Sequence, residues 1–344
     1  MTLDASLDDQ PLDVIREISP ADTMFRGDEE QYYEAGRSAL RCIRLALLLA
    51  SNTRIRRILD FPCGYGRVLR ALRARFPEAE ITACDLDRGA VDFCARTFDA
   101  LAAYSDPHAE RIALAGSFDL IWVGSLFTHL PPDAWRSFLR LFHSLLAADG
   151  VLVLTAEGRF VADQLRLGRG RLGLAPGGVS RIVAAYAQDG FAFEAFEGNR
   201  EYGCFLSSPS WVCSQIERLA HTRLLYFHER GWMGRQDVIA CVRDAQYVGF
   251  LDRADVSGVS GWAWDALRPE SAVVVEVLVD GTLRGTVEAD KYRQDLLAAG
   301  IGDGNHGFSF RLPAETGDGR EHQIHVRISG TTVGLRRSPR TVRE

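Results

Sequence analysis

Residues 57–67, with the sequence RILDFPCGYGR, constrain the fold more than any other part of the chain. A short apolar run ends at Asp60 and leads into a turn with two glycines, Gly64 and Gly66, after which residues 68–75 have the spacing of a helix. Glycines at such a turn let the backbone approach a ligand that a Cβ would push away. The segment therefore predicts an α/β sheet with a small molecule bound where the first strand ends.

The alternation of strand and helix continues along the chain. An amphipathic helix at 28–50 precedes the glycine turn, and Pro131 and Pro132 open a helix at 131–147 that we expect Gly150 to end. Beyond a loop rich in glycine and arginine, shorter elements continue the pattern. The expected strands are 81–84, 118–123, 151–155, 202–207 and 238–242, and the later helices are 179–188 and 211–220.

From Gly249 onward the pattern changes to short apolar alternations separated by turns. Asp280-Gly281 between two such runs is a strong hairpin signal, and this spacing predicts a β-sandwich or barrel. We expect three parts: an N-terminal acidic leader and cap helix at 1–50, an α/β domain at 51–245, and a smaller all-β, sandwich-like accessory domain at 246–344.

Composition excludes several classes of function. The net charge of −6 argues against a surface for nucleic acid, which needs clustered cations. Seven cysteines without a CxxC pair indicate neither a disulfide framework nor a zinc site, so we expect reduced, mostly buried thiols. The apolar stretch 46–50 follows an acidic leader, so we expect no signal peptide, no membrane span and a cytoplasmic protein.

Two carboxylates indicate which ligand the glycine turn binds. A dinucleotide site needs a third glycine where this chain has Leu69, whereas Asp60 suits a cationic ligand with an amino group and a sulfonium. Asp85, at the end of the second strand, is placed to accept both ribose hydroxyls. The alternatives are a tight connection without a ligand and, for Asp85, a helix cap.

Three segments carry a family resemblance: 59–67, 84–87 and 118–125. They resemble the first, second and fourth motifs of class I, Rossmann-like S-adenosylmethionine-dependent methyltransferases, and the resemblance covers about 58–157, although Pro62 replaces a usual glycine. It implies a methyltransferase with S-adenosylmethionine as cofactor, and a Rossmann-like sheet in the domain 51–245. The residues it implies for cofactor binding are Asp60, Pro62, Cys63, Gly64, Gly66, Arg67, Asp85, Leu86, Ser105, Asp106, Gly124, Ser125 and Leu126.

The acceptor is less constrained than the cofactor. The loop after residue 123 lacks both the Asn/Asp-Pro-Pro-aromatic motif of adenine and amide N-methyltransferases and the acid of metal-dependent enzymes, so we expect no metal. Hydroxyl oxygens and activated carbons remain as acceptors. His129 is the candidate base, or else a histidine that packs on the cofactor edge, and Glu157 and His228 are the next candidates.

The N-terminal helix and the C-terminal part of the chain each suggest an additional role. Tyr32, Tyr33 and Arg37 either close over the cofactor or form an aromatic stripe that packs on the sheet. The C-terminal part resembles a β-sandwich module of bacterial glycosyltransferases and polysaccharide-modifying enzymes, in which Trp262 and Trp264 form a sugar platform or part of the core.

These observations favour an O-methyltransferase that acts on a bacterial surface glycan or its precursor. A small-molecule methyltransferase of secondary metabolism and a non-catalytic scaffold for glycan assembly are the alternatives. The expected partners are a glycan or small-molecule acceptor and, through the C-terminal module, a glycosyltransferase or a second copy of the chain.

Overall fold

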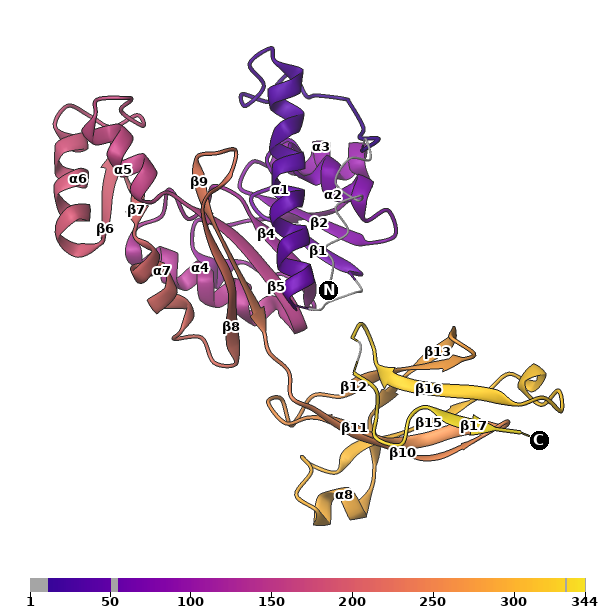
Figure 1. Ribbon diagram of the computed structural model, residues 1–344. Helices are drawn as coiled ribbons and strands as arrows, with labels where there is room; N and C mark the ends of the chain where they lie inside the picture. Colours follow the sequence, from indigo (N-terminus) through magenta and orange to yellow (C-terminus); the bar gives the residue numbers. More distant parts are fainter. Residues whose placement is uncertain (1–11, 51–54, 332, 344) are drawn as a thin grey trace. The chain divides into compact units, whose positions relative to one another are not determined.

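A computed structural model describes residues 12–50, 55–331 and 333–343. Within these residues the chain forms two compact units, one made of 12–50 and 55–243 and the other beginning at Asp244 (Figure 1). Each unit has its own apolar core, so each is described by itself.

The first unit is built on a seven-stranded sheet of order β3-β2-β1-β4-β5-β9-β8. Its strands are β1 Arg57–Asp60, β2 Glu80–Asp85, β3 Leu101–Tyr104, β4 Phe118–Val123, β5 Leu146–Ala156, β8 Thr222–Trp232 and β9 Gln236–Arg243. The first five run parallel, and β9 is antiparallel to both β5 and β8. The carboxyl ends of the parallel strands therefore share one edge, where open α/β sheets bind ligands.

Helices cover both faces of this sheet (Figure 1). Buried side chains of α1 Glu29–Ala50, α2 Leu69–Arg75 and α3 Arg88–Phe98 share an apolar cluster with Ile58, whereas those of α4 Pro132–Leu145 and α7 Pro209–Ile216 share one with Leu59. Because successive strand residues point to opposite faces, a strand covered on both sides reads as a continuous apolar run. The short 3-10 helix η2, Ala109–Arg111, contacts α4 on the same side of the sheet.

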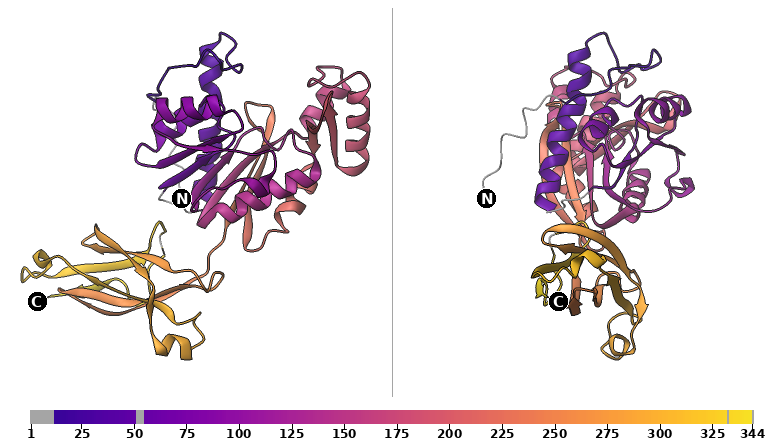
Figure 2. Two further views of the ribbon diagram at one scale, coloured as in Figure 1. Left: turned by 180° about the vertical axis from the view of Figure 1, so that it is seen from behind. Right: turned by 90° about the vertical axis from the view of Figure 1, so that its right-hand side faces the viewer.

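A small insertion separates β5 from α7. It comprises α5 Arg159–Arg166, α6 Gly178–Asp189 and the antiparallel pair β6 Phe191–Phe196 and β7 Asn199–Ser207. These elements pack around an apolar cluster of their own and stand beside the main sheet in the left view of Figure 2. The insertion thus adds a layer to the unit without entering the seven-stranded sheet.

Two expected boundaries were wrong. Gly150 does not end a helix: α4 ends at Leu145, and Gly150 lies inside β5, where a Cβ would come within 2.7 Å of the Phe118 carbonyl oxygen. The helix expected at 211–220 begins earlier, because the Ser208 hydroxyl caps it through the Trp211 amide, and it ends at Ile216.

The second unit is a sandwich of two four-stranded sheets, β10-β11-β15-β14 and β13-β12-β16-β17. Its elements are β10 Tyr247–Asp255, β11 Gly258–Asp265, β12 Val273–Val279, β13 Thr282–Ala289, β14 Lys291–Tyr292, α8 Gln294–Ala298, β15 Asn305–Arg311, η3 Ala314–Thr316, β16 His322–Ile328 and β17 Arg340–Val342. The expected hairpin at Asp280-Gly281 joins β12 to β13, with φ angles of 51° and 78°. Both values match a tight turn that glycine and aspartate favour.

The interpretation of Trp262 and Trp264 as sandwich core was wrong. Along β11 the buried positions are Val259, Gly261, Ala263 and Asp265, and the two tryptophans alternate with them on the opposite face, partly exposed. Because the side-chain period of a strand is two, the core set fixes the tryptophans outside it.

None of the seven cysteines forms a disulfide bond, and all but Cys213 are buried. No helix in the described stretches of chain has the length and apolar character needed to cross a membrane.

Candidate cofactor and acceptor site

The glycine turn, residues 61–67, joins β1 to α2 and is held by backbone geometry. The Gly64 amide donates to Asp85 Oδ2 at 2.8 Å, and the Asp87 amide donates to Asp85 Oδ1 at 3.0 Å. Gly64 has a φ of 49°, and a Cβ there would meet no atom within 4 Å. Gly66 has a φ of 77°, and its Cβ would collide with the Phe98 ring at 2.3 Å. The turn therefore needs both glycines, and Gly64 faces open space.

Asp60 is a buried carboxyl group without a complete set of partners. Its side chain is 1% exposed, and its Oδ2 atom has no hydrogen-bond partner among the described residues. Burial raises the pKa of Asp60 well above its usual range, and the neighbouring Asp85 carboxylate adds to the effect. Buried polar groups are normally paired, so Asp60 lacks a donor or a positive charge that a ligand can supply.

The surface beside Asp85 suits a nucleoside. Leu86 directly follows Asp85 and is 58% exposed, which leaves an apolar surface beside the carboxylate. The Ser105 amide donates to the Asp85 carbonyl at 2.9 Å, and Asp106 accepts from the His108 amide at 2.9 Å. The structure thus places Ser105 beside Asp85, and the adenine contact that the family resemblance implied for Ser105 and Asp106 stays a prediction.

The remaining turn residues are tied to the strands. The Cys63 amide donates to the Cys84 carbonyl, and the Gly66 amide donates to the Cys63 carbonyl, both at 3.0 Å. Pro62 is partly exposed in the same turn. These residues therefore contribute to the site by fixing the path of the backbone through the turn.

The end of β4 turns sharply at Gly124 and Ser125. Ser125 has a φ of 63°, its amide donates to Thr155 Oγ1 at 2.8 Å, and its hydroxyl lies 2.9 Å from the Gln236 amide nitrogen. A Cβ at Gly124 would approach Trp122 Nε1 to 2.8 Å, and Leu126 packs against the α4-side cluster. A strained backbone at this position, with bonds to two other strands, aims the Ser125 side chain out of the sheet edge.

The described part of the N-terminal leader, residues 12–28, is attached to the glycine turn by Arg70. The Arg70 side chain is 2% exposed and donates to the carbonyl oxygens of Gly66, Ile15 and Glu17 at 3.0, 2.7 and 3.1 Å. The Tyr32 hydroxyl donates to Asp22 at 2.5 Å. Sequence patterns did not predict an ordered leader, because side-chain contacts to a distant turn replace secondary structure.

The leader forms one wall of a cavity of about 530 Å³, which we call the leader cavity. Its lining combines the leader, α1, the glycine turn, the end of β4 and the β8–β9 hairpin: Met24, Arg26, Asp28, Gln31, Tyr32, Arg67, Ser125, Trp232, Met233, Arg235 and Gln236. Among the residues to which the sequence pointed, Tyr32, Arg67 and Ser125 belong to this lining. The others carry no motif, so only the folded chain reveals them.

His129 lies just after β4 and is oriented by its neighbours. Its Nδ1 atom is 2.8 Å from the Gly203 carbonyl oxygen, and its ring stacks on Tyr202 with centroids 4.7 Å apart. A carbonyl oxygen only accepts, so Nδ1 carries the proton and Nε2 keeps its lone pair. This tautomer is the one that a general base requires.

Glu157 follows β5 and is buried. Arg235 donates two hydrogen bonds to its Oε1 atom, at 3.0 and 3.3 Å. Burial raises the pKa of Glu157, and Arg235 and His129 partly oppose that rise. Glu157 is thereby placed to hold the Arg235 side chain, which reaches the leader cavity.

The structure does not bring His228 into this group. It is an exposed residue of β8, and the neighbouring Glu229 pairs with Arg159 at 2.6 Å. The lining of the leader cavity contains neither His228 nor the other two candidates, His129 and Glu157. Arg37 likewise points elsewhere, because it pairs with Glu34 on the surface of α1 at 2.8 Å. Position on an edge strand, which sequence spacing did not reveal, separates His228 from the other two candidates.

Tyr32 and Tyr33 are packing residues, and their closure over the cofactor stays a prediction. Both are buried against the glycine-turn region, where Arg70 lies over each ring, and Tyr32 also lines the leader cavity. In the parts of the chain that the structure describes, no cluster of three or more His, Cys, Asp or Glu side chains has a metal-holding arrangement.

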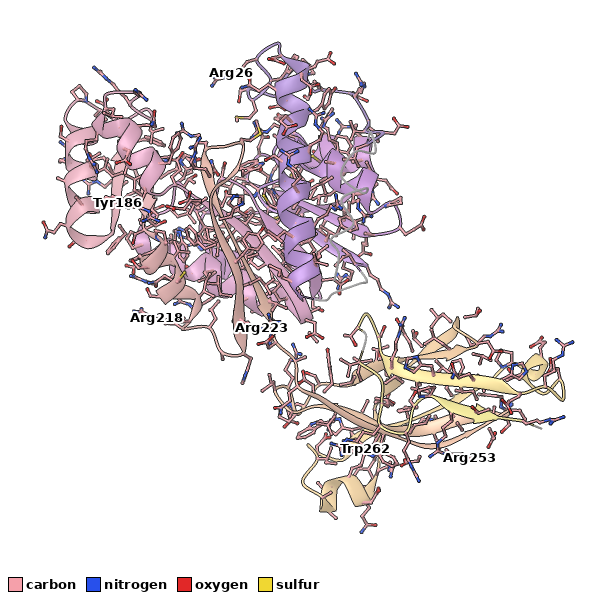
Figure 3. All side chains as sticks on the ribbon, viewed as in Figure 1. Arg26, Tyr186, Arg218, Arg223, Arg253 and Trp262 are labelled. Atoms are coloured by element: carbon pink, nitrogen blue, oxygen red, sulfur yellow. The ribbon has the colours of Figure 1, made fainter. Side chains whose placement is uncertain are left out.

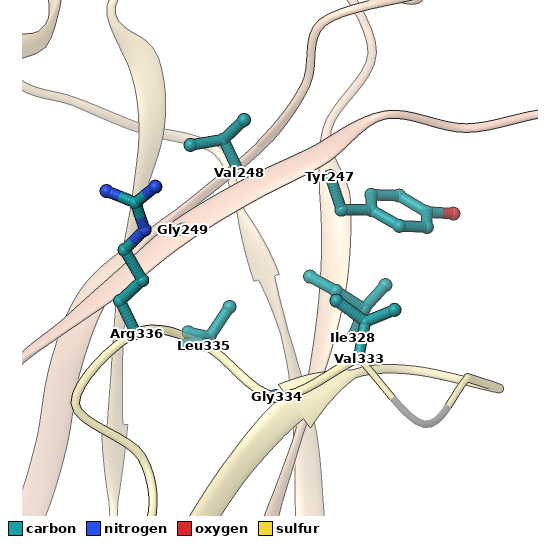
Figure 4. A pocket seen from close by; sticks show the side chains of 8 residues that line it. All are labelled: Tyr247, Val248, Gly249, Ile328, Val333, Gly334, Leu335 and Arg336. Atoms are coloured by element: carbon teal, nitrogen blue, oxygen red, sulfur yellow. The ribbon is translucent and has the colours of Figure 1, made fainter.

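The second unit contains a smaller cavity of about 200 Å³ between β10 and the chain after β16 (Figure 4). It is lined by Tyr247, Val248, Gly249, Ile328, Val333, Gly334, Leu335 and Arg336. Its lining is mainly apolar apart from the Tyr247 hydroxyl and the Arg336 guanidinium, and it contains none of the residues expected to bind cofactor or acceptor.

The sheet order, with the antiparallel strand β9 between β5 and β8 and a glycine turn after β1, is that of a Rossmann-like class I methyltransferase fold. Residues 59–152 match a family model described as a methyltransferase domain. This segment is therefore similar to methyltransferase domains, and the residues present fit S-adenosylmethionine as cofactor.

One curated relative is the malonyl-[acyl-carrier protein] O-methyltransferase of Geobacter sulfurreducens. It is 35% identical over 127 residues, which is 36% of this chain and 46% of the relative. The chain thus spans about half the length of that relative.

Solved structures similar to this chain are more distant in sequence. The mitomycin 7-O-methyltransferase MmcR is 13% identical, covering 62% of this chain and 54% of that one, with a TM-score of 0.40. An O-methyltransferase family protein from Burkholderia thailandensis is 12% identical, covering 64% and 61%, with a TM-score of 0.40. The plantazolicin methyltransferase BpumL, solved with a substrate analogue and SAH, is 12% identical, covering 63% and 86%, with a TM-score of 0.42.

Proposed function

We propose that the protein is an S-adenosylmethionine-dependent O-methyltransferase whose cofactor binds at the glycine turn and whose acceptor enters the leader cavity. The observation that carries the proposal is the unpartnered, buried Oδ2 of Asp60, beside Asp85 and Gly64 in a matched methyltransferase domain. Asp60 would face the positively charged part of the cofactor, and Asp85 would hold the ribose hydroxyls. When bound, S-adenosylmethionine supplies a methyl group activated by a sulfonium.

The chain's own residues would align the acceptor and remove its proton. The Ser125 hydroxyl and the Gln236 amide lie at the cavity and can hydrogen-bond an acceptor oxygen. His129 Nε2 would take the proton from that oxygen, since Nδ1 is committed to the Gly203 carbonyl. Glu157 would act through Arg235, whose position it fixes, as a positioning residue.

For the acceptor we propose a bacterial surface glycan or its lipid-linked or nucleotide-linked precursor. The resemblance of the C-terminal sandwich to modules of polysaccharide enzymes supports this choice, and a volume of about 530 Å³ has room for a sugar. The second candidate is a small-molecule or carrier-bound acceptor, which the O-methyltransferase relative favours by its name. A cytoplasmic location fits either acceptor.

Two measurements test the proposal. Calorimetry should show S-adenosylmethionine binding, and a chain that binds none would be a scaffold rather than an enzyme. A methyl-release assay on a panel of glycans, sugar nucleotides and small phenols should then find activity on a hydroxyl. Activity confined to amines would overturn the assignment of oxygen as the acceptor.

For the C-terminal unit we propose docking to a glycosyltransferase or to a second copy of the chain. The partly exposed Trp262 and Trp264 on the outer face of β11 support a binding role, because sandwich packing does not account for them. Residues 1–245 should bind the cofactor without this unit. Light scattering on full-length and truncated chains, with activity on short and long acceptors, tests this role. A drop confined to long glycans would instead indicate sugar binding, and no change in mass or activity would contradict both.

A further inference from the structure

Arg67 is a partly buried cation without an ionic partner among the described residues. It leaves the glycine turn and lines the leader cavity, where its guanidinium carbon lies 5.6 Å from the centroid of the Trp232 ring. Among the described residues none forms a hydrogen bond or ion pair with its side chain, which makes it unlike Arg70 and Arg235 nearby. Five guanidinium donors therefore remain available.

The acids around the cavity are already engaged. Asp22 accepts from the Tyr32 hydroxyl at 2.5 Å and from the Met24 amide at 2.9 Å. Glu157 accepts from Arg235, and Asp28 accepts from the Gln31 amide at 3.0 Å at the start of α1. Among the described residues no carboxylate lies within ion-pair distance of the Arg67 guanidinium, and Asp22 acts on it only through a longer-range Coulombic attraction.

Burial makes that charge unfavourable in the ligand-free chain. It lowers the pKa of Arg67, and the opposing influence of Tyr32 and Asp22 does not restore it. A buried cation is normally paired, and a guanidinium matches the two oxygens of a carboxylate or phosphate with parallel hydrogen bonds. The missing partner is therefore an anion that enters from the cavity.

A second arginine lies at the same cavity. Arg26 belongs to the leader, is exposed beside the N-terminal end of α1 (Figure 3) and forms no ion pair within the described residues. Its flexible side chain can reach an anion at the rim, and its charge attracts one from solution.

We infer that the leader cavity takes an acceptor with a carboxylate or phosphate group near the methylated hydroxyl, and that Arg67 is the principal contact of that anion. This inference rests on the proposed function and narrows its substrate class to acidic acceptors such as uronic acids or sugar phosphates. The cofactor also carries a carboxylate, on its methionine part, and is the other source of the same chemistry. The test must therefore separate the two.

The experiment first fills the cofactor site. Malonate and inorganic phosphate are titrated by calorimetry into the chain saturated with S-adenosylhomocysteine, so the carboxylate of the nucleoside ligand is already in place. We expect binding that Arg67→Gln weakens about tenfold or more and Arg67→Lys weakens less. Arg75→Gln is the control, because Arg75 also lies over an aromatic ring, that of Phe76, at 5.3 Å, but outside the cavity.

A second readout uses matched acceptors. With methyl glucuronide and methyl glucoside, the wild-type chain should favour the acid, and Arg67→Gln should lower that preference at least about tenfold. The inference is overturned if the saturated chain binds neither anion. It is also overturned if Arg67→Gln weakens S-adenosylhomocysteine about tenfold while anion binding persists, because the anion is then the cofactor's own carboxylate.

Failure of the proposed function gives a different result. A chain that binds neither S-adenosylmethionine nor S-adenosylhomocysteine overturns that function, yet malonate binding lost in Arg67→Gln and retained in Arg75→Gln still supports the anion site. Thermal unfolding of each variant shows whether a lost signal comes from a lost fold.

Discussion

The two walls of the site carry opposite charges and are built in different ways. At the glycine turn, Asp60 and Asp85 are acidic, and backbone amides fix Asp85 within a short stretch of chain. In the leader cavity Arg26 and Arg67 form no ion pair among the described residues, and the lining extends from Met24 to Gln236. An acidic wall suits a sulfonium and a basic wall suits an anion, so charge alone helps to keep cofactor and acceptor in their own places.

The largest expected effect tests whether the leader belongs to the fold. Arg70→Met should lower the free energy of unfolding by about 3 kcal/mol, because three carbonyl oxygens lose a buried, charged donor. Urea unfolding measures this. Arg41→Met, which breaks only a surface pair with Glu34 at 2.5 Å, is the control and should change stability by less than about 1 kcal/mol. Equal losses in both variants would mean that the leader is not attached through Arg70.

The next effect concerns the acceptor side. His129→Ala should lower turnover about a hundredfold while cofactor affinity stays within a few fold, because Nε2 acts on the acceptor proton. His143→Ala is the control, since its ring nitrogen also meets a backbone carbonyl, that of Ala220, at 3.1 Å. Steady-state kinetics at saturating cofactor decide. Lost affinity with normal turnover would make His129 a wall of the cofactor pocket.

A smaller effect is expected on the acidic wall. Asp85→Ala should weaken S-adenosylmethionine binding by about 1 to 3 kcal/mol, because the ribose hydroxyls lose their acceptor. Calorimetry measures the change, and Asp92→Ala, which removes only an exposed bond to the Tyr104 hydroxyl at 2.7 Å, is the control. An unchanged dissociation constant in folded Asp85→Ala would mean that Asp85 does not bind the cofactor, and the contrast between an acidic and a basic wall would then fail.

The smallest expected effect is a dependence of stability on pH. Burial raises the pKa of Asp237, beside Gln236, to about 6. A folded-state pKa above the unfolded value means that the protonated carboxyl stabilises the fold at low pH, and that this stability is lost as pH rises through about 6. Asp237→Asn should therefore flatten this fall and raise the free energy of unfolding at pH 7 by about 1 kcal/mol. Unfolding between pH 4 and pH 8 tests this, with Asp163→Asn, an exposed partner of Arg166, as control; matching slopes would contradict it.

Sequence patterns predicted the acidic wall better than the basic one. The strands β1, β2 and β4 are apolar runs followed by short motifs, so the positions of Asp60, Gly64 and Asp85 follow from the rule that parallel strands end at one edge. The leader has no periodicity, and Arg70 orders it through carbonyl groups about 55 residues away. Such long-range polar contacts leave no local signal.

The boundaries that failed have a similar origin. Gly150 looked like a helix end because glycine often occupies that position, yet it allows close approach to the Phe118 carbonyl within a strand. The orientation of Trp262 and Trp264 depended on which residues of β11 face the other sheet, and a one-residue shift of register would reverse it. The local sequence shows that apolar residues alternate along β11, but it does not show which of the two alternating sets is buried.

The origin of the residues that line the leader cavity bears on how acceptor specificity can evolve. Of its eleven lining residues, only Arg67 and Ser125 lie within the matched segment 59–152, and the others come from the leader, α1 and the β8–β9 hairpin. With the acceptor in the leader cavity, as proposed, substitutions in those outer segments change acceptor choice and leave the matched segment unaltered. Exchange of the leader and hairpin between related chains is therefore a direct route to engineered variants with new acceptors and the same methyl donor.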